Sequence, residues 1–410
     1  MVFHCRHQKR RNQRRRSQLR NKRCLEERII NLVAFKILLH DKAKYVALVL
    51  GVSFATLLIS QQSAIFHSLM HASTRDILEA NQADIWVMKS SVETLDQGYP
   101  IAELSVNRVR SVPGVQWAVP YYQSTAQLRT EDGRMKLVQL VGIDDLSMVG
   151  APQEMLIGTL DDFHQPDAIV MDIAGYTSIF PGVAPQVGAI VEIGQRRAVV
   201  VGICYIGASW SGMPRVYTRR SLGVAMARET LNPVTYVLAR SSSEQSPEEV
   251  AKQITQATGL RARTRTAFMS DTRTWILKYS GIAENFGITI LMGVVIGVAI
   301  VGQTFYMFSV ENLKQFATLK AIGVNNWVIL RMIMIQALFV STIGYCLGIG
   351  AANLFFAMTS TQLSGGLRGM FMHPFIFVGS GIFIVLVTLL ACVVSVRKVL
   401  TVDPAVVFRG

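Results

Sequence analysis

Residues 288–310 read ITILMGVVIGVAIVGQTFYMFSV and contain no Asp, Glu, Lys or Arg. About 20 apolar residues in a helix cross the hydrocarbon core of a bilayer, so this run predicts a transmembrane helix. Three further charge-free runs lie at residues 45–66, 332–356 and 375–396. The sequence therefore predicts four transmembrane helices.

The composition favours a membrane protein and argues against a nucleic-acid-binding one. Hydrophobic residues make up 50% of the 410 residues and only 17% are charged, whereas soluble domains carry about 25% charged residues. The net charge is +14, but residues 1–44 hold 14 Lys and Arg against three Asp and Glu. This basic tail is expected to lie on anionic headgroups, or to be a disordered extension from a start codon assigned too early. We expect no nucleic-acid partner.

Lys and Arg next to the spans predict the orientation, because basic flanks stay on the cytoplasmic side of the membrane. Residues 1–44 are strongly basic, and the connection at residues 311–331 holds three basic residues against one acid. The loop at residues 357–374 holds a single basic residue and is expected outside. We therefore expect a multi-pass protein of the inner (plasma) membrane, with the basic tail and residues 397–410 both in the cytoplasm.

The long segment between the first two spans, residues 67–287, is then an extracytoplasmic domain. Runs rich in Val and Ile predict strands, and runs with helical periodicity or capping residues predict helices. One helix opens with Ser246 and Pro247, an N-cap followed by a first-turn proline. The predicted strands are residues 84–89, 135–142, 189–193, 198–205 and 235–239, and the predicted helices are residues 102–112 and 246–258. The fold class is an α-helical membrane protein with four transmembrane helices and a large α+β domain between the first and second.

Two spans carry glycines four residues apart. Gly293 and Gly297 lie in the second span, and Gly344 and Gly348 lie in the third. This spacing lets helix backbones approach closely, so these residues are candidates for a helix–helix or dimer interface. The alternative is the raised glycine content that is general in membrane helices.

Apolar side chains also recur just before the second span. Trp275, Tyr279, Ile282 and Phe286 follow one another at spacings of four, three and four residues, which is typical of one face of a helix. The pattern predicts that the second span continues outward as a stalk. The alternative is an ordinary amphipathic helix on the core of the outer domain.

Motifs of nucleotide-binding and hydrolytic enzymes are absent from the sequence. It contains no G-x-x-x-x-G-K-[ST], H-E-x-x-H, C-x-x-C or G-x-S-x-G. The spans contain no ionisable Asp, Glu, Lys or Arg, which argues against a proton-driven pump. We expect no catalytic residue, no cofactor bound by this chain and no metal site.

The predicted cytoplasmic connection carries the most specific pattern. Residues 311–327 read ENLKQFATLKAIGVNNW, and their apolar residues recur every third position from Leu313 to Ile322. The spacing predicts a short amphipathic helix, and Gly323 is suited to end it in a left-handed conformation. The apolar face needs a partner, either the membrane surface or another protein.

This segment resembles a known family. Residues 316–323, FATLKAIG, are similar to the R-E-[IFY]-[AG]-x-L-[RK]-A-x-G motif of FtsX-like permeases, the MacB-type (type VII) membrane subunits of ABC transporters. The predicted order of segments is also that of this family: one span, then a large outer domain, then three further spans. Residues 187–217 resemble a β segment of its outer domain. Asp403, Pro404 and Arg409 match its terminal D-P-x-x-x-[LF]-R signature, and residues 83–88 and 316–323 look closest to the DevC-like subgroup.

The resemblance implies a non-catalytic subunit that binds a separate ABC ATPase, on which ATP and Mg²⁺ reside. It also implies mechanotransmission, in which the substrate is handled outside the membrane, and a homodimer or pseudo-symmetric heterodimer. The DevC-like subgroup implies export of a lipid, glycolipid or other amphipathic substrate, with an HlyD-like adaptor and an outer-membrane channel. The residues expected to contact the ATPase are Glu311, Lys314, Gln315, Phe316, Leu319, Lys320, Ala321 and Gly323; Gln315 stands where the family usually has Glu.

Two other functions fit the same architecture. The first is a lipoprotein-releasing permease. The second is a membrane-anchored sensor, or a regulator of peptidoglycan hydrolases, whose outer domain binds a protein without transport. Neighbouring genes for an adaptor, a lipoprotein carrier or a hydrolase would distinguish these possibilities.

Overall fold

The computed structural model describes residues 42–207, 211–227, 234–311, 313–361, 370 and 372–400. These residues belong to two compact units. One contains residues up to Ala64 together with Phe286–Phe355 and the segment from Met372 onward, and the other contains Ile65–Asn285 and Phe356–Phe371. The basic tail up to residue 41 and the signature residues Asp403, Pro404 and Arg409 lie outside the described residues.

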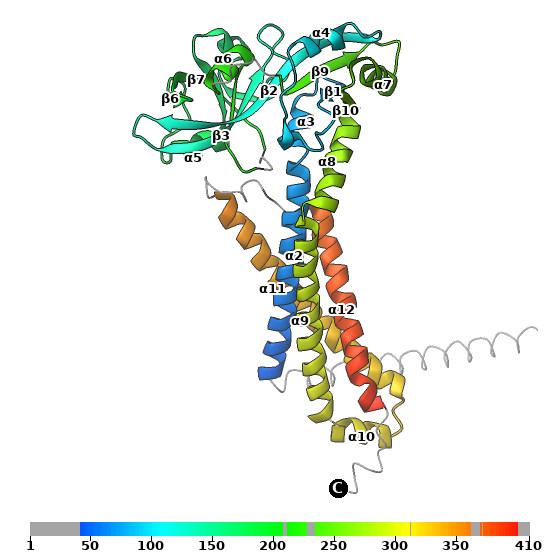
Figure 1. Cartoon of the computed structure of the whole chain (residues 1–410). Helices are drawn as coiled ribbons and strands as arrows, with labels where there is room; N and C mark the ends of the chain where they lie inside the picture. The colour runs from blue at the N-terminus through cyan, green and yellow to red at the C-terminus, as the bar shows by residue number, and fades with distance from the viewer. Residues whose placement is uncertain are drawn as a thin grey trace, which may run out of the picture. The chain divides into compact units, whose positions relative to one another are not determined.

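The first unit contains the membrane-spanning helices (Figure 1). In the described part of the chain, four helices are long and apolar enough to cross a bilayer, which confirms the four predicted spans. Several of them extend beyond the charge-free runs by one or two helical turns. The helices are α2 (Lys42–Ala72), α9 (Ile282–Glu311), α11 (Asn326–Thr361) and α12 (Pro374–Leu400), and the short α10 (Leu313–Ala321) connects α9 to α11.

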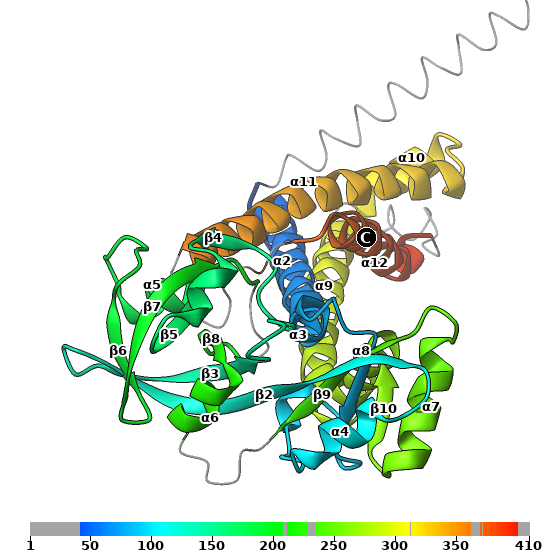
Figure 2. The same cartoon turned by 90° about the horizontal axis from the view of Figure 1, so that it is seen from above.

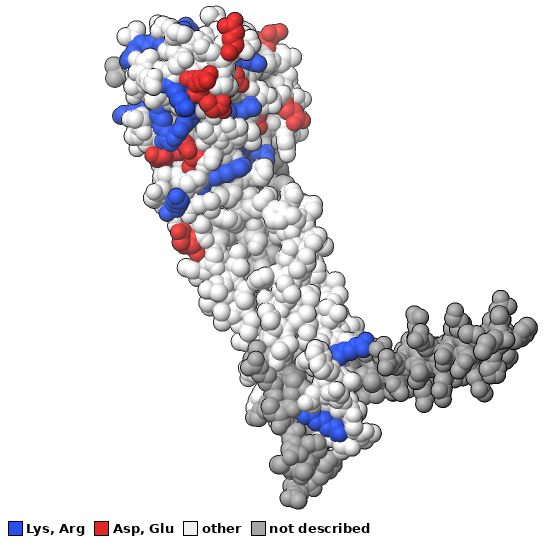
Figure 3. Space-filling model, turned by 90° about the vertical axis from the view of Figure 1, so that its right-hand side faces the viewer, with Lys and Arg blue, Asp and Glu red and all other residues white. Residues whose placement is uncertain are grey.

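The core of this unit forms around α2. Val52 of α2 is buried in one apolar cluster with Phe305 of α9, Ala337 of α11 and Ile384 of α12. Several hydroxyl groups of α2 donate to backbone carbonyls one turn earlier in the same helix; for example, Thr56 Oγ1 donates to the Val52 carbonyl at 2.8 Å. On the face shown in Figure 3, the middle part of these helices shows no charged side chains, and charged side chains lie toward their two ends. A lipid-facing surface requires this, because a charge in the hydrocarbon core is costly.

The second unit contains an α+β domain whose sheet has ten strands among the described residues. Its first lobe is an antiparallel sheet in the order β10-β1-β9-β2, and α4 and α7 cover one face (Figure 2). Val87 of β1, Val109 of α4 and Ile254 of α7 are buried together on that face. The elements are β1 (Ile85–Met88), α4 (Leu104–Arg110), β2 (Val115–Thr130), β9 (Tyr236–Ser241), α7 (Pro247–Thr258) and β10 (Arg261–Thr264).

The second lobe closes on itself as a small barrel. Around the ring, β2 pairs with β3, β3 with β8, β8 with β5, β5 with β7, β7 with β6, and β6 with β2 again. Leu128 of β2, Leu140 of β3 and Val200 of β7 are buried in its core. The remaining elements are β3 (Met135–Ile143), β4 (Met155–Ile157), η2 (Leu160–His164), β5 (Ala168–Asp172), α5 (Ile173–Ile179), β6 (Ile190–Ile193), β7 (Arg196–Cys204), β8 (Arg215–Arg219) and α6 (Arg220–Met226).

A shared core joins the two lobes. The long strand β2 pairs with β9 along its first half and with β3 along its second half. On the face of the first lobe opposite α4, Trp86 makes aromatic contacts with Tyr121, Tyr236 and Phe268, with ring centroids 5.5 to 5.8 Å apart. Ile77, from the short helix α3 (Arg75–Glu79), is buried in the same core. The helix that directly follows α2 is therefore part of the outer domain.

The predicted stalk is not one helix. α8 (Arg265–Tyr279) ends before Ser280, and Gly281 adopts a left-handed conformation with φ +68° before α9 begins at Ile282. The face of α8 that is buried carries Phe268, Thr272 and Ile276. Tyr279, from the predicted stripe, is 72% exposed. The interpretation of Trp275, Tyr279, Ile282 and Phe286 as one continuous helical face is wrong, because the helix is interrupted at Ser280 and Gly281.

Candidate functional site

The predicted coupling segment forms the expected helix. α10 covers Leu313–Ala321, and Gly323 follows with φ +96°, a conformation that disfavours every residue with a Cβ. The Gly323 N–H donates to the Lys320 carbonyl at 2.9 Å, which closes the last turn. The prediction that Gly323 ends this helix is confirmed.

The residues predicted to contact the ATPase differ in their exposure and in their partners. Lys314, Gln315 and Ala321 are exposed, and Lys320 is half-buried. Glu311 forms an ion pair with Lys44 at the start of α2, so it links two spans of its own chain. Phe316 and Leu319 lie in α10, but their side chains are outside the described part of the structure.

Two exposed apolar residues beside α10 were not among the predicted contacts. Ile322 and Trp327 are each 75% exposed. Large exposed apolar side chains at a connection between spans are candidates for contact with a protein or with the membrane surface, and Trp is enriched among energetically dominant interface residues. In the sequence, these two contacts could have been predicted from the large apolar residues that precede and follow the helix-ending Gly323.

The four glycines predicted to allow close approach all lie against α2. A Cβ at Gly297 would be 2.8 Å from Ala55 Cβ, and one at Gly344 would be 2.7 Å from Val52 Cβ. Gly293 faces Leu58, and Gly348 faces Thr56 and the Ser53 carbonyl. In this chain the close approach is therefore between α2 and the helices α9 and α11, one on each side.

A substitution at one of these glycines is expected to destabilise the membrane unit. A Cβ at Gly348 would meet Thr56 Cβ at 2.6 Å, so Gly348→Val is expected to lower the free energy of unfolding by about 1–3 kcal/mol. Gly350 lies in the same helix with open space around it, and Gly350→Val is the matched control. Thermal unfolding in detergent measures both variants. Equal melting temperatures for the two would show that α11 does not pack on α2 at Gly348.

A buried ion pair connects α3 to the sheet. The Arg215 side chain on β8 is 2% exposed and pairs with Asp76 of α3, whose side chain is 13% exposed. The Arg215 backbone N–H donates to Asp172 Oδ1 at 2.7 Å, and Nη1 donates to the Gly207 carbonyl at 3.2 Å. Burial alone would lower the pKa of Arg215, but Asp76 and the neighbouring phenols and carboxylate raise it above its ordinary value. Arg215 therefore stays charged.

A second contact holds the same region. Thr74 lies between α2 and α3, and its hydroxyl accepts a hydrogen bond from Arg273 Nη2 of α8 at 3.2 Å. Since α8 leads into α9, the contact of Thr74 ties the chain that leaves α2 to the chain that enters α9, whereas Asp76 ties the chain that leaves α2 to β8. No local pattern predicts either contact, because the partners are far apart along the chain.

Comparison with known proteins identifies the family. Residues 46–257 match the MacB-like periplasmic core domain, and residues 287–404 match the FtsX-like permease C-terminal region. The first match alone covers more than half of the chain. The chain belongs to the FtsX-like, MacB-type family of ABC transporter permeases. The helix α10 lies in the FtsX-like region, and most of the outer α+β domain lies in the MacB-like region.

Relatives of this permease have the same general description. An uncharacterized ABC transporter permease of Mycobacterium tuberculosis H37Rv, Rv0072, is 23% identical over 338 residues, covering 82% of this chain and 87% of the relative. A second one, Rv2563, is 23% identical over 323 residues, covering 76% of this chain and 80% of the relative. Both matches extend over most of each protein.

Two solved structures are similar to the outer domain. The extracellular domain of the noncanonic ABC-type transporter YknZ from Gram-positive bacteria is 19% identical with a TM-score of 0.32, covering 44% of this chain and 98% of that one. The periplasmic region of MacB from Actinobacillus actinomycetemcomitans is 14% identical with a TM-score of 0.36, covering 47% and 96%.

Proposed function

We propose that this permease is the non-catalytic subunit of an ABC exporter in the inner membrane, with both chain ends in the cytoplasm. A separate ABC ATPase, which carries ATP and Mg²⁺, docks on α10 and the residues beside it. Its closure on ATP tilts the spans and moves the outer domain, so that the substrate is handled outside the membrane. The observation that carries the proposal is the coupling helix: a short helix between two spans, ended by Gly323 and bordered by the exposed Ile322 and Trp327.

The geometry of the spans supports mechanical transmission. α2 is held on two sides by glycine contacts, and Glu311, next to α10, is paired with Lys44 of α2. A push on α10 would therefore reach α2 as well as α9. Inside the outer domain, α3 continues from α2 and is tied to β8 by the buried Asp76–Arg215 pair. This route uses packed elements and needs no polar path through the four spans.

Membership of the family supports a proposal for the assembly and for the substrate class. We infer a dimer of this chain, a periplasmic HlyD-like adaptor and an outer-membrane channel as partners, and membrane lipids around the spans. A lipid, glycolipid or other amphipathic molecule, as in the DevC-like subgroup, is the proposed cargo. The uncharged spans agree with a cargo that is handled outside the membrane and does not pass between the helices.

Labelling of introduced cysteines tests whether α10 can reach a cytoplasmic ATPase. Cys204 is buried, and burial raises the pKa of its thiol, so the exposed Leu146 and Ile322 are the better positions, at 93% and 75% exposure. In a chain with its own cysteines replaced, a membrane-impermeant maleimide should label Leu146→Cys in intact spheroplasts. It should label Ile322→Cys only after permeabilisation. Labelling of Ile322→Cys in intact spheroplasts would place α10 on the wrong side for docking.

A further inference from the structure

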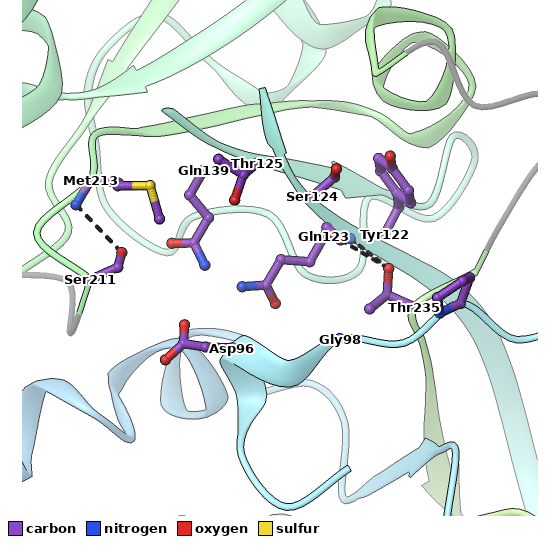
Figure 4. Close-up of a pocket in the computed structure, with 11 residues that line it drawn as sticks. Asp96, Gly98, Tyr122, Gln123, Ser124, Thr125, Gln139, Ser211, Met213 and Thr235 are labelled. Carbon is purple, nitrogen blue, oxygen red and sulfur yellow. Dashed lines mark hydrogen bonds between the residues drawn. The ribbon is translucent and has the colours of Figure 1, made fainter. Parts of the chain in front are cut away.

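A cavity of about 400 Å³ opens in the outer domain between the strands β2 and β3 and the turn η1 (Leu95–Gln97). Figure 4 shows Gln123, Gln139 and Asp96 directed toward the same space. Cavities of this size accommodate small organic molecules. Hydroxyl-bearing side chains complete much of the wall, and they belong to Ser124, Thr125, Ser211 and Thr235.

Gln123 on β2 and Gln139 on β3 occupy positions on the side of each strand that carries apolar side chains in the shared core. Residues two apart on a strand point to the same side of a sheet. Tyr121 and Val141 are buried in the shared core, and Gln123 and Gln139 are the neighbours two positions from them on β2 and β3. Two amides replace apolar side chains at the edge of this core, and stability alone does not explain that choice.

Both amides have an unpaired acceptor. Gln139 is only 4% exposed, and its Oε1 is buried without a hydrogen-bond partner among the described residues. The buried Oε1 of Gln123 likewise lacks a partner there. A buried carbonyl oxygen without a donor costs free energy, and a ligand that donates hydrogen bonds would remove that cost.

Asp96 adds a negative charge to these two acceptors. Within the described chain its carboxylate has no hydrogen-bond or ion-pair partner. Asp96 is an exposed residue at the cavity, and partial desolvation raises the pKa of its carboxyl to about 6; nearby Asp76 also raises this pKa and Arg215 lowers it. Since Asp76 and Arg215 pair with each other, Asp96 is the uncompensated charge, and it is ionised at neutral pH.

We propose that this cavity binds a small organic amine whose ammonium group donates to Gln123, Gln139 and Asp96. An ammonium has three donors and no acceptor, which matches two amide oxygens and one carboxylate. A neutral polyol could use the same oxygens, but it would leave the charge of Asp96 uncompensated. Binding needs neither the ATPase nor transport, so its test is independent of the proposed function.

Calorimetric titration of the purified full-length chain in detergent tests the proposal with a matched pair of probes. 4-Amino-1-butanol should bind at pH 7.5, and 1,4-butanediol, in which a hydroxyl replaces the ammonium, should bind at least about tenfold more weakly. At pH 5.0 Asp96 is mostly protonated, whereas an alkylammonium stays charged. Affinity for the amine should therefore fall about tenfold between pH 7.5 and pH 5.0, given a pKa of about 6.

Variants separate the cavity from a general charge effect. Asp96→Asn should weaken binding of the amine at least about tenfold at pH 7.5. Asp161→Asn, which removes an exposed acid elsewhere on the domain, should leave it unchanged. Gln139→Leu should weaken binding without lowering the melting temperature, because it removes an unpaired buried acceptor. No binding of the amine, equal binding of the diol, or full affinity in Asp96→Asn would overturn the proposal.

Discussion

An Arg215→Met chain is expected to lose about 3–5 kcal/mol of the free energy of unfolding of its outer domain. The substitution keeps much of the apolar bulk but leaves Asp76 without the guanidinium that pairs with it. A buried carboxylate that loses its only close counter-charge is among the most destabilising changes a core can receive. Urea unfolding of the full chain, followed by the hydrogen exchange of peptides from β8 and α3, measures the loss in the domain itself.

The control for this experiment is an ion pair on the surface of the same domain. Arg197 and Asp167 are 3.6 Å apart, with side chains 60% and 39% exposed, so Arg197→Met should cost less than about 1 kcal/mol. The double variant Asp76→Leu with Arg215→Met should recover much of the stability, because both charges are then gone. Equal unfolding of the Arg215→Met and Arg197→Met chains would refute a structural role for the buried pair.

The spans could be predicted because their signal is local. Length and the absence of charge decide whether a segment enters a bilayer, and both are read from a single stretch such as residues 288–310. The end of α10 at Gly323 could also be predicted from a local signal, since it depends on the conformation of one residue. The five predicted strands and the helices at residues 102–112 and 246–258 all have counterparts in the structure, within a few residues at their ends.

The features of the fold and of the site that could not be predicted depend on contacts between distant parts of the chain. No local pattern shows that β2 serves both lobes, that β6 closes the barrel, or that Arg215 meets Asp76. The glycine spacing identified the residues of close approach, but not α2 as their partner. The stalk prediction failed because helical periodicity continued across Ser280 and Gly281 although the backbone does not. The dipeptide Ser280-Gly281 is typical of a helix end, and the prediction gave more weight to the helical spacing of the apolar residues than to this dipeptide.

The second large effect is expected at α10. If Phe316 is an apolar anchor in a groove of the ATPase, Phe316→Asp should lower the affinity at least about thirty-fold, equivalent to about 2 kcal/mol. Thr318→Asp is the matched control: it adds the same charge to the same helix, two residues away and thus on a different face. Gly323→Ala should also weaken coupling, because φ +96° disfavours a Cβ and the helix would end differently.

Co-purification of the cognate ATPase with the tagged chain tests docking on α10 most directly. Wild type, Phe316→Asp and Thr318→Asp are compared after equal membrane insertion and dimer formation have been shown for all three. Docking on α10 predicts that wild type and Thr318→Asp retain the ATPase and transport, and that Phe316→Asp loses both together. Recovery of the ATPase with Phe316→Asp at the wild-type level would contradict it.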